Sequence, residues 1–469
     1  MVQIDILPDD VLLGIFDLYM MVMDPPIAFK QRTEAWQTLV HVCRRWRYLV
    51  FGSPHSLNLQ LVCTPQTPAR DTLDVWPALP LIILGNLAST DTDNVIAALG
   101  QRNHVCRIDL HLYGWQLAEV SAPMHVSFPE LTDLRLWSYG ETPTVIPNSF
   151  LGGSAPRLRT LILHTISFPG LPKLLLSATH LVVLRLWDIP HSGYISPKAI
   201  VASLTVLSSL ETLDLHFQSP QSHPDEGSRR PPPSKRSVLP ALGMFYFTGV
   251  TEYLEELVSR IDAPQLSCVG ITFFNQIDFD CPQLARFINC TPALRGQDEA
   301  HVRFYDSYAN VTLRHRVSQP YYHENLLINI SCNEQDWQVL SIKQVCNSLP
   351  SLSWVEDLYI ELGPSLTPEL VWKNDAIENT LWLELLHPFI TVKNLYLSKP
   401  FGPLAGILAA LQELVGSRIT EVLPSLQNIF IEGLKPSGSF QENIEELIAS
   451  RRLSDHPIII SVWDKDFTT

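Results

Sequence analysis

The fold of this chain is decided by a short pattern that recurs in its middle. It reads Leu131-Thr132-Asp133-Leu134-Arg135-Leu136, then LRTLIL (158–163), LVVLRL (181–186) and LETLDL (210–215). With any aliphatic residue allowed at the three leucine positions, the same pattern also starts at 79, 105, 239 and 266. Successive starts are 23 to 29 residues apart. A period of this length predicts one strand per repeat in a parallel sheet, with a crossover on the outer side.

This period is typical of leucine-rich repeats and predicts an α/β fold, a curved parallel sheet with outer helices. Helices are expected between the strands, over 93–100, 171–178, 197–207 and 251–261. The array is regular over 79–275 and irregular over 276–469. In the irregular part the pattern returns at 355, 392 and 426, and helices are expected over 379–387, 404–414 and 441–451. We therefore expect an irregular leucine-rich-repeat solenoid over 56–469.

Length and composition agree with an elongated array. A chain of 469 residues exceeds the size at which a single core stops growing. Hydrophobic residues make up 46% of it, and its mean hydropathy is +0.09. Asp5, Asp9 and Asp10 occupy the place of a signal peptide's basic and apolar regions, and the longest apolar stretch (401–411) is too short to span a bilayer. We expect a soluble intracellular protein, in the cytoplasm or the nucleus.

Two short amphipathic helices are expected within residues 1–55, in IDILPDDVLLGIFDLYM (4–20) and AWQTLVHVCRRWRYLVFGSP (35–54). Pro8 suits a first helical turn, and Asp9 and Asp10 favour the positive end of a helix dipole. The apolar face of the first helix carries Val11, Leu12, Ile15 and Phe16.

The segments Leu7-Pro8-Asp9-Asp10 and Val42-Cys43-Arg44-Arg45-Trp46 resemble an F-box, with one departure: the link 20–33 is longer than usual and contains Pro25 and Pro26. The resemblance implies that residues 1–55 dock on the Skp-type linker protein of a cullin ubiquitin ligase, while the repeats capture a protein substrate. The residues implied to form or support the linker-binding surface are Leu7, Pro8, Val11, Leu12, Ile15, Phe16, Leu39, Val42, Cys43 and Trp46.

Further stretches are similar to a recurrent set of F-box proteins of mushroom-forming fungi. They are SGYISP (192–197), EYLEELVSRIDAPQL (252–266) and ITFFNQIDF (271–279). An alternative stays open, in which the N-terminal helices only cap the array and the chain is a ligase-independent protein-binding scaffold. The two hypotheses differ in whether the apolar side chains of these helices face solvent or pack on the first strands, around 57–61.

The repeat register also predicts a binding surface, because side chains alternate between the two faces of a strand. The fifth and seventh places of each repeat should face the open, concave side. They include a row of alternating histidine and tryptophan beside charged residues, an arrangement common at interface hot spots. The candidates for this concave surface are His111, Arg135, Trp137, His164, Arg185, Trp187, His216 and Phe245. The alternative is that the chain's own loops cover these residues and that Asp109 with Arg135, and Arg185 with Asp214, are ordinary cross-strand pairs.

The insertion SPQSHPDEGSRRPPPSKRSV is expected to be an exposed proline-rich loop over 218–237. It is either a tolerated surface insertion or a recognition loop in which phosphate on Ser228, Ser234 or Ser237 pairs with nearby basic residues. Its basic cluster, Arg229, Arg230, Lys235 and Arg236, is the only dense one in a chain of net charge −15, which disfavours a nucleic-acid partner.

No motif predicts catalysis, a cofactor or a metal site. The eight cysteines form no C-x-x-C and no pairing with histidines at ligand spacing, so they are expected to be buried thiols. A zinc site from the three concave histidines is disfavoured because alternate strands would hold them roughly 10 Å apart. The sequence predicts a binding protein without enzymatic activity and with no membrane partner.

Overall fold

The computed structural model describes residues 6–22, 29–54, 57, 59–75, 78–86, 92–140, 143–220, 236–274, 279–316, 325–362, 379–398, 403–414, 418, 420–432, 444–445, 447–449, 451–452 and 457–463. The chain divides into two compact units, Met1–Tyr194 (unit 1) and Ile195–Thr469 (unit 2). Each unit is built on a mostly parallel sheet whose strands alternate with helices along the chain. The fold is an α/β solenoid of leucine-rich-repeat type, as predicted.

Unit 1 begins with three helices, α1 (Asp9–Val22), α2 (Phe29–Val42) and α3 (Arg44–Gly52). The expectation of one continuous second helix is wrong, because the chain breaks at Cys43. This residue has extended backbone, and its Sγ accepts a hydrogen bond from the backbone N–H of Trp46 at 3.5 Å. A side chain that caps the first free N–H groups of a helix fixes where the helix starts.

The sheet of unit 1 contains, in spatial order, β1 (Leu61–Cys63), β2 (Leu81–Gly85), β3 (Val105–Tyr113), β4 (Asp133–Tyr139), β6 (Thr160–His164) and β8 (Val183–Ile189). All neighbouring strands in this series are parallel. The pattern leucines lie opposite one another, as Leu136, Leu163 and Leu186 do. These three side chains are buried, so the pattern forms the core ladder that the sequence predicts.

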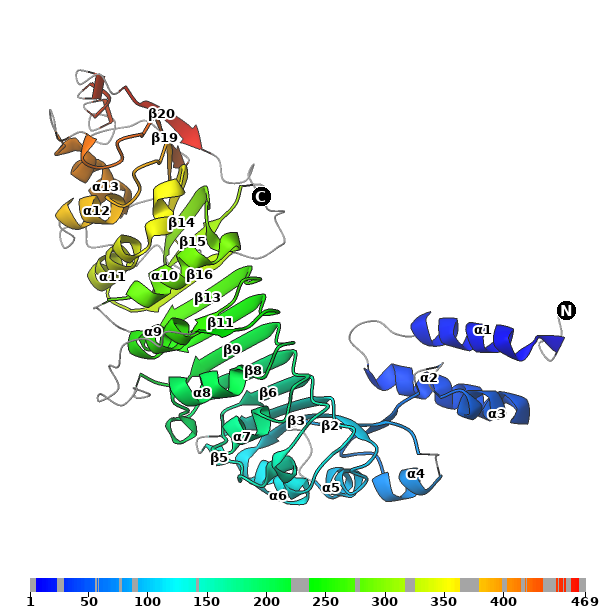
Figure 1. Ribbon diagram of the computed structural model, residues 1–469. Coiled ribbons are helices and arrows are strands. Elements are labelled where there is room, and N and C mark those ends of the chain that lie inside the picture. The colour runs from blue at the N-terminus through cyan, green and yellow to red at the C-terminus, as the bar shows by residue number, and fades with distance from the viewer. Residues whose placement is uncertain are drawn as a thin grey trace. The chain divides into compact units, whose positions relative to one another are not determined.

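The crossovers of unit 1 contain α4 (Ala69–Val75), α5 (Asp93–Leu99), α6 (Gly114–Ser121) and α7 (Leu171–Leu175). Helices α5, α6 and α7 form an outer layer along the sheet (Figure 1). The short strands β5 (Thr144–Val145) and β7 (Ile166–Ser167) pair beside it. Helices α5 and α7 begin where the sequence predicts them, and α7 ends three residues earlier than the predicted 178.

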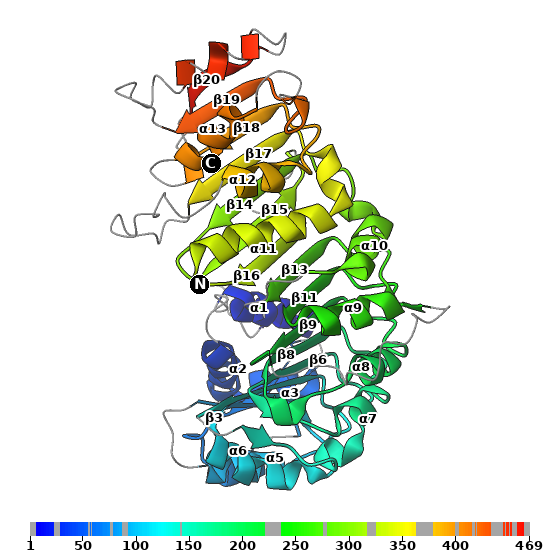
Figure 2. The same ribbon diagram turned by 90° about the vertical axis from the view of Figure 1, so that its left-hand side faces the viewer.

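Unit 2 continues the same arrangement with parallel strands β9 (Thr212–Phe217), β11 (Met244–Gly249) and β13 (Cys268–Phe273). Its first helices are α8 (Pro197–Leu204), α9 (Thr251–Arg260) and α10 (Pro282–Cys290). Helices α9 and α10 lie along one side of these strands, and the later α11 (Gln335–Ser348) covers strands further along the sheet (Figure 2). Residues 221–235 of the predicted proline-rich loop, with Ser228 and Ser234, lie outside the described residues. Ser237 is not a loop residue, because it begins β10 (Ser237–Val238), which pairs with β12 (Ile261–Asp262).

The repeat predicted to start at Leu239 starts instead at Leu242. Phe245 pairs with Leu213 and Val269, and Phe247 pairs with Leu215, so these phenylalanines take the core positions. The pattern of this repeat is therefore LGMFYF (242–247), three residues later than predicted. The aliphatic pattern predicted a start at Leu239 because the core places of the observed repeat hold phenylalanine.

The loss of period after residue 275 has a simple cause, an antiparallel insertion. Strands β14 (Glu299–Phe304), β15 (Tyr308–Arg314) and β16 (Leu326–Ser331) form an antiparallel meander. The strand β16 pairs with β13 in parallel, and β14 pairs in parallel with β17 (Asp357–Leu362). One antiparallel strand, β15, thus lies inside an otherwise parallel sheet in the described part of unit 2.

The regular pairing then resumes as predicted. Strands β17, β18 (Asn394–Leu397), β19 (Asn428–Glu432) and β20 (Ile459–Trp463) are parallel. Helices α12 (Asn379–Leu386) and α13 (Pro403–Gln412) match their predicted positions. Of the helix predicted over 441–451, the described residues 444–445, 447–449 and 451 are helical. Among described residues, no helix is both long and apolar enough to cross a membrane.

Candidate functional site

The N-terminal helices carry an exposed apolar row on one face of α1. Val11, Ile15 and Leu18 are 43%, 43% and 63% exposed, and Val42 at the end of α2 is 56% exposed. Spacings of four and three residues place Val11, Ile15 and Leu18 on the same side of a helix. We call these three residues the α1 row. Large apolar side chains grouped on a surface in this way indicate a contact site.

The opposite face of α1 is buried among the other two helices. Leu12 and Phe16 are 1% exposed, and the Phe16 ring lies 4.7 Å from the Trp46 ring between centroids. Leu39 is also buried, while Cys43 and Trp46 are half-buried. The ten residues that the F-box resemblance names therefore divide into an interior group and an outward group, the latter containing Pro8, Val11, Ile15 and Val42.

Arg45 holds the start of α1 in place. Its guanidinium binds the Asp9 carboxylate at 2.6 Å and donates to the backbone carbonyl of Leu7 at 2.5 Å. Leu7 and Asp9 flank Pro8, so the two halves of the motif, 36 and 38 residues apart, are joined directly. In the sequence Arg45 is only a member of the segment that resembles an F-box, so this contact was not predicted.

The helices also contact the start of the sheet. The indole N–H of Trp36 in α2 donates to the backbone carbonyl of Gln60, just before β1, at 3.0 Å. This contact uses α2 and leaves the α1 row exposed. Capping of the array and docking on a linker protein, the two alternatives raised by the sequence, therefore concern different faces of the same three helices.

The predicted concave row of unit 1 is present and in register. His111, Trp137, His164 and Trp187 lie directly opposite one another on β3, β4, β6 and β8. The ring centroids of His111 and Trp137 are 5.0 Å apart at an interplanar angle of 10°, and those of Trp137 and His164 are 4.8 Å apart at 23°. We call these four residues the ring ladder. All four are half-buried, so they remain in contact with solvent.

His164 is fixed by its neighbours. Its Nε2 lies 3.0 Å from the Asp188 carboxylate and its Nδ1 lies 3.0 Å from the Thr165 hydroxyl. Both partners have left-handed backbone, with φ of 49° and 56°. Such backbone is uncommon for residues other than glycine and often marks functional sites.

The charged residues beside the ring ladder are paired with one another. Asp109 lies 2.9 Å from Arg107, 3.4 Å from His111 and 4.0 Å from Arg135, the last being the predicted cross-strand pair. Arg185 lies over the Trp187 ring, 5.5 Å from its centroid. Of the three arginines beside the ring ladder, Arg107 and Arg135 thus contact Asp109, and Arg185 contacts the Trp187 ring.

The two predicted concave residues of unit 2 have different environments. His216 on β9 is half-buried. Phe245 is fully buried, and its ring lies 6.4 Å from that of Phe287. The prediction that Phe245 faces the concave side is wrong, because the shifted repeat start places it in the core. Thr248 takes the position opposite His216 instead.

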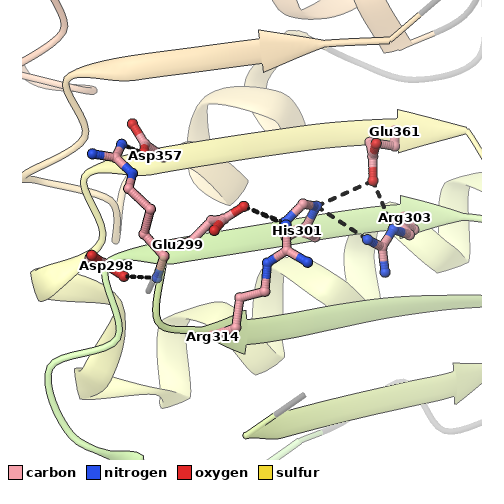
Figure 3. Close-up of polar contacts among 8 residues, drawn as sticks. Asp298, Glu299, His301, Arg303, Arg314, Asp357 and Glu361 are labelled. Carbon is pink, nitrogen blue, oxygen red and sulfur yellow. Dashed lines mark hydrogen bonds and ion pairs between the residues drawn. The ribbon is translucent and has the colours of Figure 1, made fainter. Parts of the chain in front are cut away.

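A buried ionic cluster that the sequence did not predict lies on β14, β15 and β17 of unit 2 (Figure 3). The His301 ring sits between two carboxylates, with Nε2 2.9 Å from Glu299 and Nδ1 3.3 Å from Glu361. Arg303 donates to Glu361 at 2.7 Å, and Arg314 donates to Glu299 at 2.7 Å. At one end, Arg316 pairs with Asp357.

The charges of this cluster stabilise one another. Burial by itself would raise the pKa of Glu299, but hydrogen bonds from His301 and Arg314 outweigh it and lower that pKa to about 2. The alternation of Glu299, His301 and Arg303 with Ala300, Val302 and Phe304 could have predicted a strand here. Their partners Arg314 and Glu361 are distant in sequence, so the pairing could not be predicted.

The ring of His301 also begins a second stack of rings. His301, Tyr359, Tyr396 and Phe430 follow one another at centroid distances of 4.3, 4.2 and 4.6 Å. Trp463 on β20 contacts both tyrosines edge-on. Burial raises the pKa of Tyr359, and the charge of Glu299 raises it further. Because His301 is 5% exposed and engaged at both nitrogens, this cluster is organised to hold strands together.

Five of the eight cysteines are buried, Cys43 and Cys106 are half-buried, and Cys290 is exposed, so the expectation of buried thiols is wrong for Cys290. Burial raises the pKa of the Cys63 thiol to about 11 and that of Cys281 and Cys346 to about 12. Such thiols carry little thiolate, which is the reactive and metal-binding form. Among the residues that the structure describes, no three His, Cys, Asp or Glu side chains are grouped to hold a metal ion.

Neither family models nor curated proteins match the sequence. Among solved structures, the chain is similar to the crystal structure of the leucine-rich repeat-containing protein LegL7 from Legionella pneumophila. The two are 14% identical, the match covers 86% of this chain and 99% of that one, and the TM-score is 0.25. The strand pairing and the repeat period of this chain define its fold.

Proposed function

We propose that this chain is the substrate-recognition adaptor of an SCF-type (Skp–cullin–F-box) ubiquitin ligase. Its N-terminal helices dock on the Skp-type linker protein, and its repeats capture a protein substrate inside the cell. The observation that carries the proposal is the α1 row, Val11, Ile15 and Leu18, exposed on a helix whose opposite face is buried. The ubiquitin transfer itself belongs to other subunits, and this chain acts by binding.

The buried side of the helices gives the exposed side a fixed shape. Leu12, Phe16 and Trp46 pack together, and Arg45 ties α3 to the start of α1. A docking surface of this kind works by removing apolar area from water, at roughly 25 cal/mol per Å². It loses less conformational entropy on binding when its helices are already packed against one another.

The second candidate function is a ligase-independent scaffold, favoured by the hydrogen bond from Trp36 to Gln60. In that case the helices would only cover the first strand of the array. A cap needs a polar outer face, however, and the α1 row is apolar. The adaptor proposal accounts for both the contact to Gln60 and the exposed row.

The proposal is tested with the purified full chain and its cognate Skp-type protein in a binding titration. The variant Val11→Glu/Ile15→Glu places charges on the α1 row and should weaken binding at least about 100-fold, since each buried unpaired charge is costly. Val206→Glu is the matched control, because Val206 is exposed and lies in unit 2.

Circular dichroism and thermal melting must show that all three proteins are equally folded. Binding by wild type and control but not by the double variant supports the adaptor. Absence of binding by the wild-type chain would overturn it and favour the scaffold.

A further inference from the structure

We propose that the ring ladder of unit 1 binds a proline-rich segment of the partner protein in the polyproline II conformation. The proposal deepens the protein-capture half of the proposed function and rests on it, but it needs no contribution from the N-terminal helices. The observation behind it is the orientation of the side-chain rings in the ring ladder.

The rings present their edges to the open side. The centroid spacings of 5.0 and 4.8 Å match the distance between neighbouring strands. With interplanar angles of 10° and 23°, His111, Trp137 and His164 are stacked face to face along the sheet. The faces of the middle ring are therefore occupied by its neighbours, and its outward part is an edge.

Ring edges carry partial positive charge, and the indole edge of Trp137 also carries an N–H donor. A row of such edges is complementary to carbonyl oxygens. The backbone of a polyproline II segment has no internal hydrogen bonds, so its carbonyl oxygens are free to accept. Its conformation is also fixed before binding, which lowers the entropic cost of capture.

The tyrosines beside the ladder favour a ligand with apolar rings. Asp109 is shared by Arg107, His111 and Arg135, so its carboxylate is engaged within the chain. Tyr113 and Tyr139 lie opposite each other on β3 and β4, two residues beyond His111 and Trp137 on the same face. The Tyr139 hydroxyl lies 3.3 Å from His111 Nδ1, and Tyr113 is 44% exposed. Proline rings pack well against aromatic side chains of this kind.

Trp115, in the first turn of α6, is 55% exposed and follows Tyr113 by two residues. The strained backbone at Thr165 and Asp188 holds His164 in the ladder. An exposed aromatic surface with a strained support fits a binding surface better than a packing layer.

The test is isothermal titration calorimetry of the full chain with a capped peptide of about twelve prolines. A glycine-serine peptide and an aspartate-glutamate peptide of equal length are the comparison ligands. We expect the proline peptide to bind in the micromolar range and the other two to give no heat of binding. Trp137→Ala should weaken binding about tenfold or more, because stacked aromatic anchors dominate such interfaces.

Two further variants keep the test decisive. Trp137→Phe keeps a ring but removes the indole N–H, and we expect it to bind more weakly than wild type and more tightly than Trp137→Ala. Trp354→Ala removes an exposed tryptophan in unit 2 and should bind as wild type does. No binding of the proline peptide, equal binding by Trp137→Ala, or preference for the acidic peptide would overturn the proposal. Binding of the Skp-type linker protein is measured in a separate titration with variants of α1. The adaptor proposal and the proline-peptide proposal can therefore fail independently.

Discussion

At the scale of single residues, the carboxylate of Glu299 shows how charge is held inside this protein. It is 5% exposed and accepts hydrogen bonds from His301 and Arg314, which lower its pKa to about 2. A carboxylate whose pKa is lower in the folded chain than in the unfolded chain favours folding when it is ionised. Its contribution is complete above its ordinary pKa of 4.5 and is lost as the pH falls toward 2.

We therefore predict that Glu299→Gln lowers the free energy of unfolding at pH 7 by about 2 kcal/mol, since it removes the charge that binds the partly exposed Arg314. Urea unfolding at pH 7 and at pH 3 measures this. The wild-type chain should lose stability between these two pH values, and the variant should lose less. An equal loss in both proteins would show that Glu299 is not the titrating group.

A second residue-scale prediction tests the corrected repeat register. Phe245→Ala should lower the free energy of unfolding by about 3 to 5 kcal/mol, because it empties a fully buried position. His216→Ala, on the neighbouring strand and half-buried, should cost less than about 1 kcal/mol. Chemical denaturation of both variants gives the comparison. Equal costs would restore Phe245 to the concave face.

At the scale of elements, close packing of helices predicts opposite effects for two glycines. A Cβ added to Gly406 in α13 would lie 2.6 Å from Trp382 Nε1 of α12, whereas one added to Gly14 in α1 meets nothing within 4 Å. Gly14→Ala should therefore raise the free energy of unfolding by up to about 1 kcal/mol through helix propensity. Gly406→Ala should lower it, since the buried Trp382 ring must move. Thermal melting of the two variants measures these opposite effects. A higher melting temperature for both would show that the Trp382 ring moves aside without a loss of stability.

The helices and strands show which parts of the fold could be predicted from the sequence. The strands from β3 to β9 follow from one pattern with a period in the twenties, because each repeat buries its apolar side chains against its neighbours. In β2 the pattern that starts at Leu79 is one residue out, because Ile83 and Gly85 lie opposite the core residues Ile108 and Leu110. Two further features were not predicted. The break between α2 and α3 depends on a capping contact of Cys43, and the meander β14–β15–β16 depends on pairing between residues distant in sequence.

The candidate sites divide in the same way. Strand alternation was enough to place His111, Trp137, His164 and Trp187 in one row. It could not place Phe245, because a pattern limited to aliphatic residues fits the start at Leu239 and not the start at Leu242, where the core places hold phenylalanine. Helical periodicity gave the apolar face of α1 but could not say which of its members face solvent. That depends on where α2 and α3 pack.

At the scale of the whole molecule, two binding tasks are assigned to different residues of the chain. The α1 row is proposed to hold the chain on the ligase, and the ring ladder is proposed to hold the partner. Neither task needs a reactive group. Among the described residues, burial raises the pKa of thiols such as Cys63 and Cys346, and pairing within the fold lowers the pKa of Glu299.

The most direct test of the adaptor claim is amide hydrogen exchange of the full chain with and without its cognate Skp-type protein. We predict slower amide exchange in α1 and at the end of α2 when the linker protein is added, and unchanged amide exchange in β3, β4, β6 and β8. Unchanged exchange in α1, or protection confined to the strands, would contradict it.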